Sequence, residues 1–149
     1  MGLFTVIDAV KDIVGGTTGF TATGRNANVS IGNYKVLTIG GERAAVIELG
    51  GADFASGSSV RRSGIYINEH SILIRLFHKY KYDGESYTDM LKDTDAVMAI
   101  LHANDTLDST VLDSHVTTVL PIDMTEMNDG EAYFLMQEVT LIAQEEVTH

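Results

Sequence analysis

Hydrophobic residues alternate with polar ones along the long segments of the second half, and they recur at helical spacing between those segments. Residues 65–80 alternate over their whole length, which predicts the longest strand. The centre of this segment is apolar on both faces, so we expect a central strand covered on each side. Residues 87–104 carry an apolar stripe that predicts an amphipathic helix, with Ser86 as its N-cap. The stripe consists of Met90, Leu91, Thr94, Val97, Met98 and Leu101.

The end of the chain predicts two antiparallel strands. Residues 116–127 and 132–147 both alternate, and the Asn-Asp-Gly sequence at 128–130 is a strong turn signal between them. Pro121 lies within the first segment and predicts an edge strand or a β-bulge, because proline has no N–H to donate to a sheet. We expect one face of the last strand to consist of Leu135, Gln137, Val139, Leu141 and Ala143.

The beginning of the chain predicts a helix followed by a long irregular segment. Apolar residues recur at helical spacing over residues 2–14, and the glycine pair at 15–16 is typical of a helix end. Residues 15–33 are rich in Gly, Thr, Asn and Ala without periodicity, which predicts a long loop or arm. Residues 34–39 and 43–49 then alternate about a glycine-pair turn, as in a hairpin.

These elements predict one α+β domain over residues 1–149. We expect a mostly antiparallel sheet of four or five strands packed against the amphipathic helix, with a short N-terminal helix. Residues 15–33 and the small-residue segment 50–64 are expected to be flexible loops or arms. Asp8 and Asp12 interrupt the first apolar stretch, which also lacks a basic region, so we expect no signal peptide. No apolar run approaches the roughly 18 residues of a membrane span.

Charge divides the chain into two unequal parts. Residues 1–82 carry nine Lys or Arg and six Asp or Glu, a net charge of +3. Residues 83–149 carry one Lys and fifteen Asp or Glu, a net charge of −14. Such an acidic half repels phosphate, so we expect no sequence-specific binding of nucleic acid. Two interpretations stay open: a solvated surface, or a surface that remains near DNA without binding it.

The residue types that hold metals do not form a known pattern. The chain has no cysteine, which excludes disulfides and thiolate metal sites. None of its five histidines has a partner at the i, i+4 helical zinc spacing. His70 and His78 share one strand at about 27 Å if it is fully extended, too far apart to bind one metal. We expect ordinary surface or interface histidines, and no cofactor.

The carboxylates near the last turn leave two further functions open. Their spacing does not match the twelve-residue calcium loop, and turn chemistry explains the Asn-Asp-Gly sequence without an ion. The chain has no nucleophile elbow, P-loop or dinucleotide fingerprint, and no tryptophan for a sugar platform. A small hydrolase that uses clustered carboxylates, or His115 with Asp113, remains an alternative, as does a calcium-dependent binding module. The clustered carboxylates are Asp123, Glu126, Asp129 and Glu131.

Arg61 and Arg62 form the only adjacent basic pair. One interpretation is that they keep a small-residue loop soluble. The other is that they contact the acidic surface of a neighbouring copy, because the planar guanidinium meets carboxylates with two hydrogen bonds. A chain that binds itself head to tail in this way builds a ring when the rotation closes.

The order of the elements resembles a known family. RAAVIELGGADF and SILIRLFHKY match its first two core strands, DMLKDTDAVMAIL its helix, and GEAYFLMQEVTLIAQEEV its closing strand. On these segments, residues 43–147 are similar to the tail terminator proteins of long-tailed bacteriophages, including those of lambda-like phages. The additional strand at 34–39 and the Gly/Thr-rich segment before it depart from the family. They leave another neck, stopper or tail-tube protein open.

The resemblance implies a structural protein of the virion with no enzymatic chemistry and no cofactor. It implies a homohexameric ring at the head-proximal end of the tail, assembled in the host cytoplasm. The ring would stop growth of the tail tube, contact the tail-tube protein, and join the tail to a head completion or connector protein. Phe54, Arg61 and Arg62 are then candidates for the subunit interface. The carboxylates of Asp123, Glu126, Asp129 and Glu131 are candidates for a lumen through which DNA passes without specific binding, and no membrane is involved.

Overall fold

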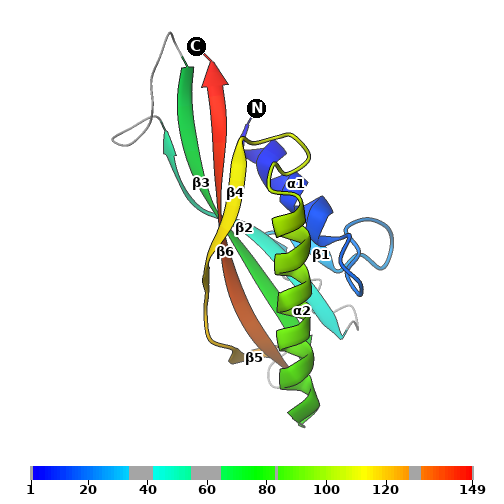
Figure 1. Ribbon diagram of the computed structural model, residues 1–149. Helices are drawn as coiled ribbons and strands as arrows, with labels where there is room; N and C mark the ends of the chain where they lie inside the picture. Colours follow the sequence, from blue (N-terminus) through cyan, green and yellow to red (C-terminus); the bar gives the residue numbers. More distant parts are fainter. Residues whose placement is uncertain (1, 34–41, 55–64, 83, 128–131, 149) are drawn as a thin grey trace.

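The computed structural model describes residues 2–33, 42–54, 65–82, 84–127 and 132–148 (Figure 1). These residues form an α+β fold with two helices and one six-stranded sheet, one strand more than the sequence predicts. The predicted strand at 34–39 lies outside the described residues. The elements are α1 (Leu3–Val14), β1 (Val29–Ile31), β2 (Arg43–Phe54), β3 (Ile65–Lys79), α2 (Gly84–Ala103), β4 (Asp113–Val119), β5 (Asp123–Met127) and β6 (Ala132–Thr148).

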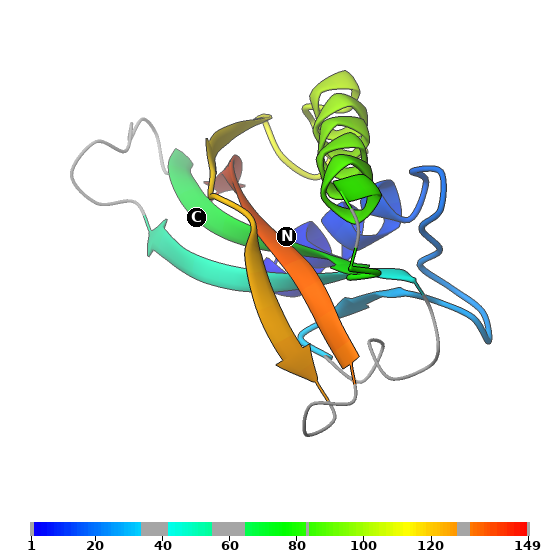
Figure 2. The same ribbon diagram turned by 90° about the horizontal axis from the view of Figure 1, so that it is seen from below.

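The strands follow the order β1-β2-β3-β6-β4, and β5 pairs with β6 beside β4. All pairs are antiparallel except β1 with β2. β3 and β6 pair from Ile65 and Thr148 to Lys79 and Phe134, so the two longest strands form the centre of the sheet. Both helices lie on the same face of this sheet (Figures 1 and 2).

The main core lies between the helices and that face. The side chains of β3 that point toward it are at most 2% exposed, as the alternation predicts. Burying an aliphatic side chain of this size contributes about 1.5–3 kcal/mol to folding. The buried face of β6 is confirmed as well. The helix-side residues of β3 are His70, Ile72, Ile74, Leu76 and His78, and those of β6 are Leu135, Gln137, Val139, Leu141 and Ala143.

A smaller apolar cluster lies on the opposite face of the sheet. It consists of Ala44, Val46, Phe77 and Phe134, with Met136 against it. Beside it, Arg75 on β3 binds Glu48 on β2 at 2.7 Å and Glu138 on β6 at 3.0 Å. This triad crosses the three central strands, so β3 is a central strand with both faces occupied, as predicted.

Two predicted loops contain strand residues. Residues 29–31 pair with β2 in parallel, although the sequence predicts a loop over 15–33. β2 extends to Phe54, so the predicted loop from residue 50 begins too early. The pairing of β2 with β3 shifts register between Leu49 and Gly51, which marks a bulge. A side chain at Gly50 would press against Leu73, so this glycine permits close approach within the sheet.

The prediction that Ser86 caps α2 is wrong. The helix begins at Gly84, and Ser86 is buried in its first turn. Its hydroxyl instead accepts a hydrogen bond of 3.0 Å from the backbone N–H of Lys81, before the helix. The sequence alone cannot distinguish these two positions, because serine satisfies backbone donors in both.

The segment after α2 forms a turn of unusual hand. Leu107, Asp108 and Ser109 have φ values of 48°, 57° and 66°, in the left-handed region. Pro121 then separates β4 from β5, where the sequence predicts one strand. β4 lies at the sheet edge and shifts register between Val116 and Thr118, in agreement with the edge or bulge that this proline predicts.

Among the described residues, no helix is long and apolar enough to cross a membrane.

Candidate functional site

The predicted interface and lumen residues are only partly described. Arg61, Arg62, Asp129 and Glu131 lie outside the described residues. Phe54 is the last residue of β2, Asp123 is exposed at the start of β5, and Glu126 lies within β5. The structure therefore places two of the four lumen candidates on one strand and leaves the others untested.

The alternative catalytic pair does not form a site. Asp113 and His115 are both exposed on the edge strand β4, opposite Gln144 and Ile142. No hydrogen bond or ion pair joins them. Within the described part of the chain, no three His, Asp or Glu side chains come together in a way that could hold a metal ion.

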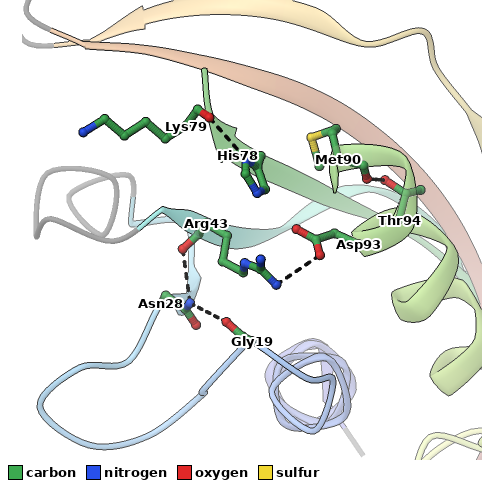
Figure 3. Close-up of polar contacts among 8 residues, drawn as sticks. All are labelled: Gly19, Asn28, Arg43, His78, Lys79, Met90, Asp93 and Thr94. Atoms are coloured by element: carbon green, nitrogen blue, oxygen red, sulfur yellow. Dashed lines mark hydrogen bonds and ion pairs between the residues drawn. The ribbon is translucent and has the colours of Figure 1, made fainter. Parts of the chain in front are cut away.

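Sequence reasoning missed a buried polar cluster where β2, β3 and α2 meet (Figure 3). Asp93 of α2 accepts a hydrogen bond of 3.2 Å from the Arg43 guanidinium of β2 through Oδ1. His78 of β3 is 1% exposed, and its Nδ1 lies 3.1 Å from the carbonyl oxygen of Lys79. Asp93 Oδ2 and His78 Nε2 are both buried without a hydrogen-bond partner.

The loop before β1 fixes the position of Arg43. The Asn28 amide donates to the carbonyl oxygens of Gly19 at 3.0 Å and Arg43 at 3.1 Å (Figure 3). Its Oδ1 accepts a bond of 2.7 Å from the Thr21 N–H. Gly19 has a φ of +90°, and an added Cβ there would collide with the Arg43 guanidinium. The loop therefore packs against the arginine that pairs with Asp93.

The surroundings of Asp93 make its carboxyl harder to ionise than the same group in water. Burial raises the pKa of the Asp93 carboxyl above its ordinary value of 3.8, although Arg43 and His78 act in the opposite direction. One ion pair with a partly exposed arginine does not offset the loss of water around the carboxylate. The cluster joins β2, β3 and α2, and it contains two buried polar atoms without hydrogen-bond partners. Ionisation of Asp93 therefore affects how α2 packs on the sheet.

His70 forms a second buried pair, with Glu145 of β6. Its Nε2 lies 3.1 Å from the glutamate Oε2, and both side chains are at most 4% exposed. The expectation of surface histidines is therefore wrong for His70 and His78. Their alternation with Ile72, Ile74 and Leu76 was a sufficient signal for burial.

A tyrosine-lined groove opens near the start of α2, with a volume of about 450 Å³. The Tyr80 and Tyr82 rings lie 4.8 Å apart, and the Tyr133 ring meets Tyr82 edge-on at 6.4 Å. Tyr82 is 72% exposed and Tyr87 50%. The clustering of three of the six tyrosines within residues 80–87 was the available sequence signal. The groove is lined by Tyr80, Tyr82, Gly84, Tyr87, Met124 and Leu135.

A smaller pocket of about 240 Å³ lies near the other end of α2. His102, Ser114 and His115 line it together with apolar residues. The Ser114 hydroxyl donates to the carbonyl oxygen of Asp105 at 2.8 Å. This hydroxyl forms no hydrogen bond with His102 or His115. The pocket therefore lacks the nucleophile–base contact that acyl transfer requires.

Three strands extend past their neighbours at the end of the sheet opposite the tyrosine-lined groove. β1 reaches β2 only as far as Ile47, and β4 reaches β6 only as far as Gln144. Among the described residues, 52–54, 65–69 and 145–148 therefore pair only within β2, β3 and β6. We name these residues the arm. Figure 2 shows β2 and β3 leaving the region beneath the helices at this end.

No protein-family model and no curated protein sequence matches this chain.

Proposed function

We propose that this protein is a structural subunit of a bacteriophage neck, and specifically a tail terminator. In this role, copies of the chain form a homohexameric ring at the head-proximal end of the tail. The ring stops growth of the tail tube, contacts the tail-tube protein on one side, and joins a head completion or connector protein on the other. The protein assembles in the host cytoplasm and remains in the virion.

The observation that carries the proposal is the arm together with the tyrosine-lined groove. The arm is a piece of sheet whose strands pair only with one another among the described residues, and the groove exposes several large apolar side chains. Exposed apolar patches and open sheet edges are features of association surfaces. Residues 135 and 148 of β6 lie about 43 Å apart at strand spacing, so the two surfaces are at opposite ends of the molecule. Contact between unlike ends gives a head-to-tail interface, which builds a ring when the rotation between neighbouring copies closes.

The candidate chemistry supports an assembly role over catalysis. Asp113 and His115 form no hydrogen bond or ion pair with each other, and Ser114, which lines a pocket with His102 and His115, donates its hydroxyl to the carbonyl oxygen of Asp105. The two buried pairs, Arg43 with Asp93 and His70 with Glu145, join elements of the fold. Another neck, stopper or tail-tube protein would also act by assembly, and would differ in the protein that it contacts.

The first experiment is the native mass of the purified protein across concentration and salt, with and without tail tubes. A tail terminator gives a species of six times the 16.2 kDa chain mass, either alone or when tubes are added. The ring dissociates as salt rises if charge contributes to the interface. A strict monomer under every condition, tubes included, contradicts the proposal.

A further inference from the structure

Two hydrogen-bond acceptors lie together in the buried cluster of β2, β3 and α2. His78 Nδ1 lies 3.1 Å from the carbonyl oxygen of Lys79. A carbonyl oxygen only accepts, so Nδ1 carries the ring proton, and Nε2 of the neutral imidazole is an acceptor. Oδ2 of an ionised Asp93 is an acceptor too. Both atoms are buried without a hydrogen-bond partner within the described part of the chain.

The two side chains are within electrostatic reach of each other. Figure 3 shows the Asp93 carboxylate turned from α2 toward the space between Arg43 and the His78 ring. Burial raises the pKa of the Asp93 carboxyl, while the charges of Arg43 and His78 lower it. A neighbouring charge acts in this way over about 4–6 Å. One added proton satisfies both acceptors, because the atom that holds it donates to the other.

The other charged groups around this pair leave its own proton to set the local charge. Glu42, which precedes β2, binds Lys81 at 2.7 Å, so these two charges offset each other. The residue of β6 opposite His78 is the uncharged Leu135. The Lys79 side chain points away from the cluster (Figure 3). The charged groups that act on the pair or on its neighbours are Arg43 and Glu42 beside β2, Lys81 after β3, and Asp89 on α2.

This pair encloses, in sequence, the segment that forms most of the tyrosine-lined groove. His78 lies two residues before Tyr80, and Asp93 lies six residues after Tyr87. Four of the six lining residues fall within residues 80–87. Tyr82 within this segment has a φ of 59°, in the left-handed region that tyrosine rarely adopts. A movement of α2 relative to the end of β3 therefore changes the shape of the groove.

We propose that His78 and Asp93 form a proton-dependent latch that sets the width of the tyrosine-lined groove. The latch is closed when one proton is shared between His78 Nε2 and Asp93 Oδ2, which holds the start of α2 against the end of β3. As pH rises, this proton leaves to water and two facing acceptors remain, so the latch opens. At low pH a second proton places a charged His78 beside Arg43 without a carboxylate, which also opens it. The latch does not depend on the tail terminator role.

A tryptophan reporter tests the latch, because the natural chain has no tryptophan. Tyr82→Trp places an indole in the groove at a position that is 72% exposed. Its fluorescence is measured between about pH 4 and pH 9, which spans the ordinary pKa values of aspartate and histidine. We expect the emission maximum to move to longer wavelength as pH rises, because the widened groove exposes the indole to water. Phe4→Trp, at a 70% exposed position on α1, is the control, and its emission maximum should stay constant.

Two substitutions in the Tyr82→Trp chain fix the latch in opposite states. Asp93→Asn supplies an amide that donates to His78 Nε2 at every pH while its oxygen accepts from Arg43, so the emission should stay at the closed value. His78→Phe fills a similar volume without a nitrogen, so the emission should stay at the open value. Asp95→Asn removes an exposed carboxylate of the same helix and should leave the transition unchanged.

Nitrogen NMR of the wild-type protein gives a second measurement that needs no variant. The Nε2 signal of His78 should change at the same pH as the reporter, while Nδ1 stays protonated throughout. If a latch variant fails to fold, this signal decides. An Nε2 that keeps one protonation state across the transition excludes the latch.

Three fluorescence outcomes would overturn the inference. The latch is wrong if the Tyr82→Trp emission does not change with pH, or if it changes to the same extent with Asp93→Asn and with His78→Phe. It is also wrong if the change coincides with loss of the far-ultraviolet circular dichroism signal, because the whole protein then unfolds. None of these results depends on native mass, so the proposed ring is tested separately.

Discussion

Asp93 is the residue whose chemistry the fold changes most clearly. It is buried on α2 with one oxygen bound to Arg43 and the other without a hydrogen-bond partner. A carboxyl whose pKa is raised by folding is harder to ionise in the folded than in the unfolded state. Ionisation of Asp93 therefore destabilises the folded protein. The contribution of this group to stability is greatest when it is protonated.

Asp93→Asn should make the free energy of unfolding less dependent on pH. Relative to this variant, wild-type protein should lose stability as pH rises from the ordinary value of 3.8 through the raised pKa, and no more above it. Urea unfolding at a series of pH values measures the difference. Asp95→Asn, at an exposed position of the same helix, is the control. It should leave the pH dependence of the unfolding free energy as in wild type. Parallel profiles for wild type and Asp93→Asn would contradict the argument.

Gly19 tests whether the loop before β1 holds Arg43 in place. Gly19→Ala should destabilise the protein by about 2 kcal/mol or more, since its φ of +90° is unfavourable for alanine and its Cβ would displace the guanidinium. Gly24→Ala is the matched control, because Gly24 has a φ of +97° and open space around it. We expect about 1 kcal/mol there, from the backbone alone. Equal losses of unfolding free energy in chemical denaturation would show that Arg43 is not constrained by this contact.

At the scale of elements, sequence patterns predicted long elements with repeated hydrophobic spacing. They missed a short strand and a contact between residues that are distant in the sequence. The alternation over 65–80 gave β3 nearly to the residue, because fifteen successive positions report the same two faces. β1 has only three residues and shows no period. The pairing of Arg43 with Asp93 joins residues fifty positions apart, which no local pattern records. The sequence did not predict the tyrosine-lined groove, because residues 80–87, Met124 and Leu135 come from three separate segments of the chain.

The left-handed turn between α2 and β4 offers a stabilising substitution. Ser109 has a φ of 66° and is exposed, so glycine there relieves strain. We expect Ser109→Gly to stabilise the protein by about 0.5 kcal/mol, the gain being limited by the greater freedom of glycine in the unfolded chain. Thermal and urea unfolding measure it. Ser109→Ala, which keeps the Cβ, should give no gain, and a gain equal to that of glycine would exclude relief of backbone strain as the cause.

At the scale of the whole molecule, the acidic half of the chain bears on the proposed lumen. If Asp123 and Glu126 line the passage for DNA, reversing their charge should make the ring retain DNA. Asp123→Lys with Glu126→Lys should bind duplex DNA more tightly, with affinity that falls as salt rises. Asp95→Lys with Asp105→Lys makes the same change in net charge at two exposed positions elsewhere in the chain. Filter binding compares the two assembled proteins, and equal DNA retention would place the predicted lumen residues elsewhere.

The order of the strands also has a consequence for how the chain is made. β6 lies between β3 and β4 in the sheet, and it also pairs with β5, so one late segment completes most of the pairing. While a ribosome is still synthesising residues 132–148, the long apolar β3 has one edge without its partner. The nascent chain therefore cannot complete its fold as it emerges, and it exposes an aggregation-prone strand until translation of β6 ends. Stalled or truncated products of this protein should accordingly be substrates for chaperones rather than smaller folded domains.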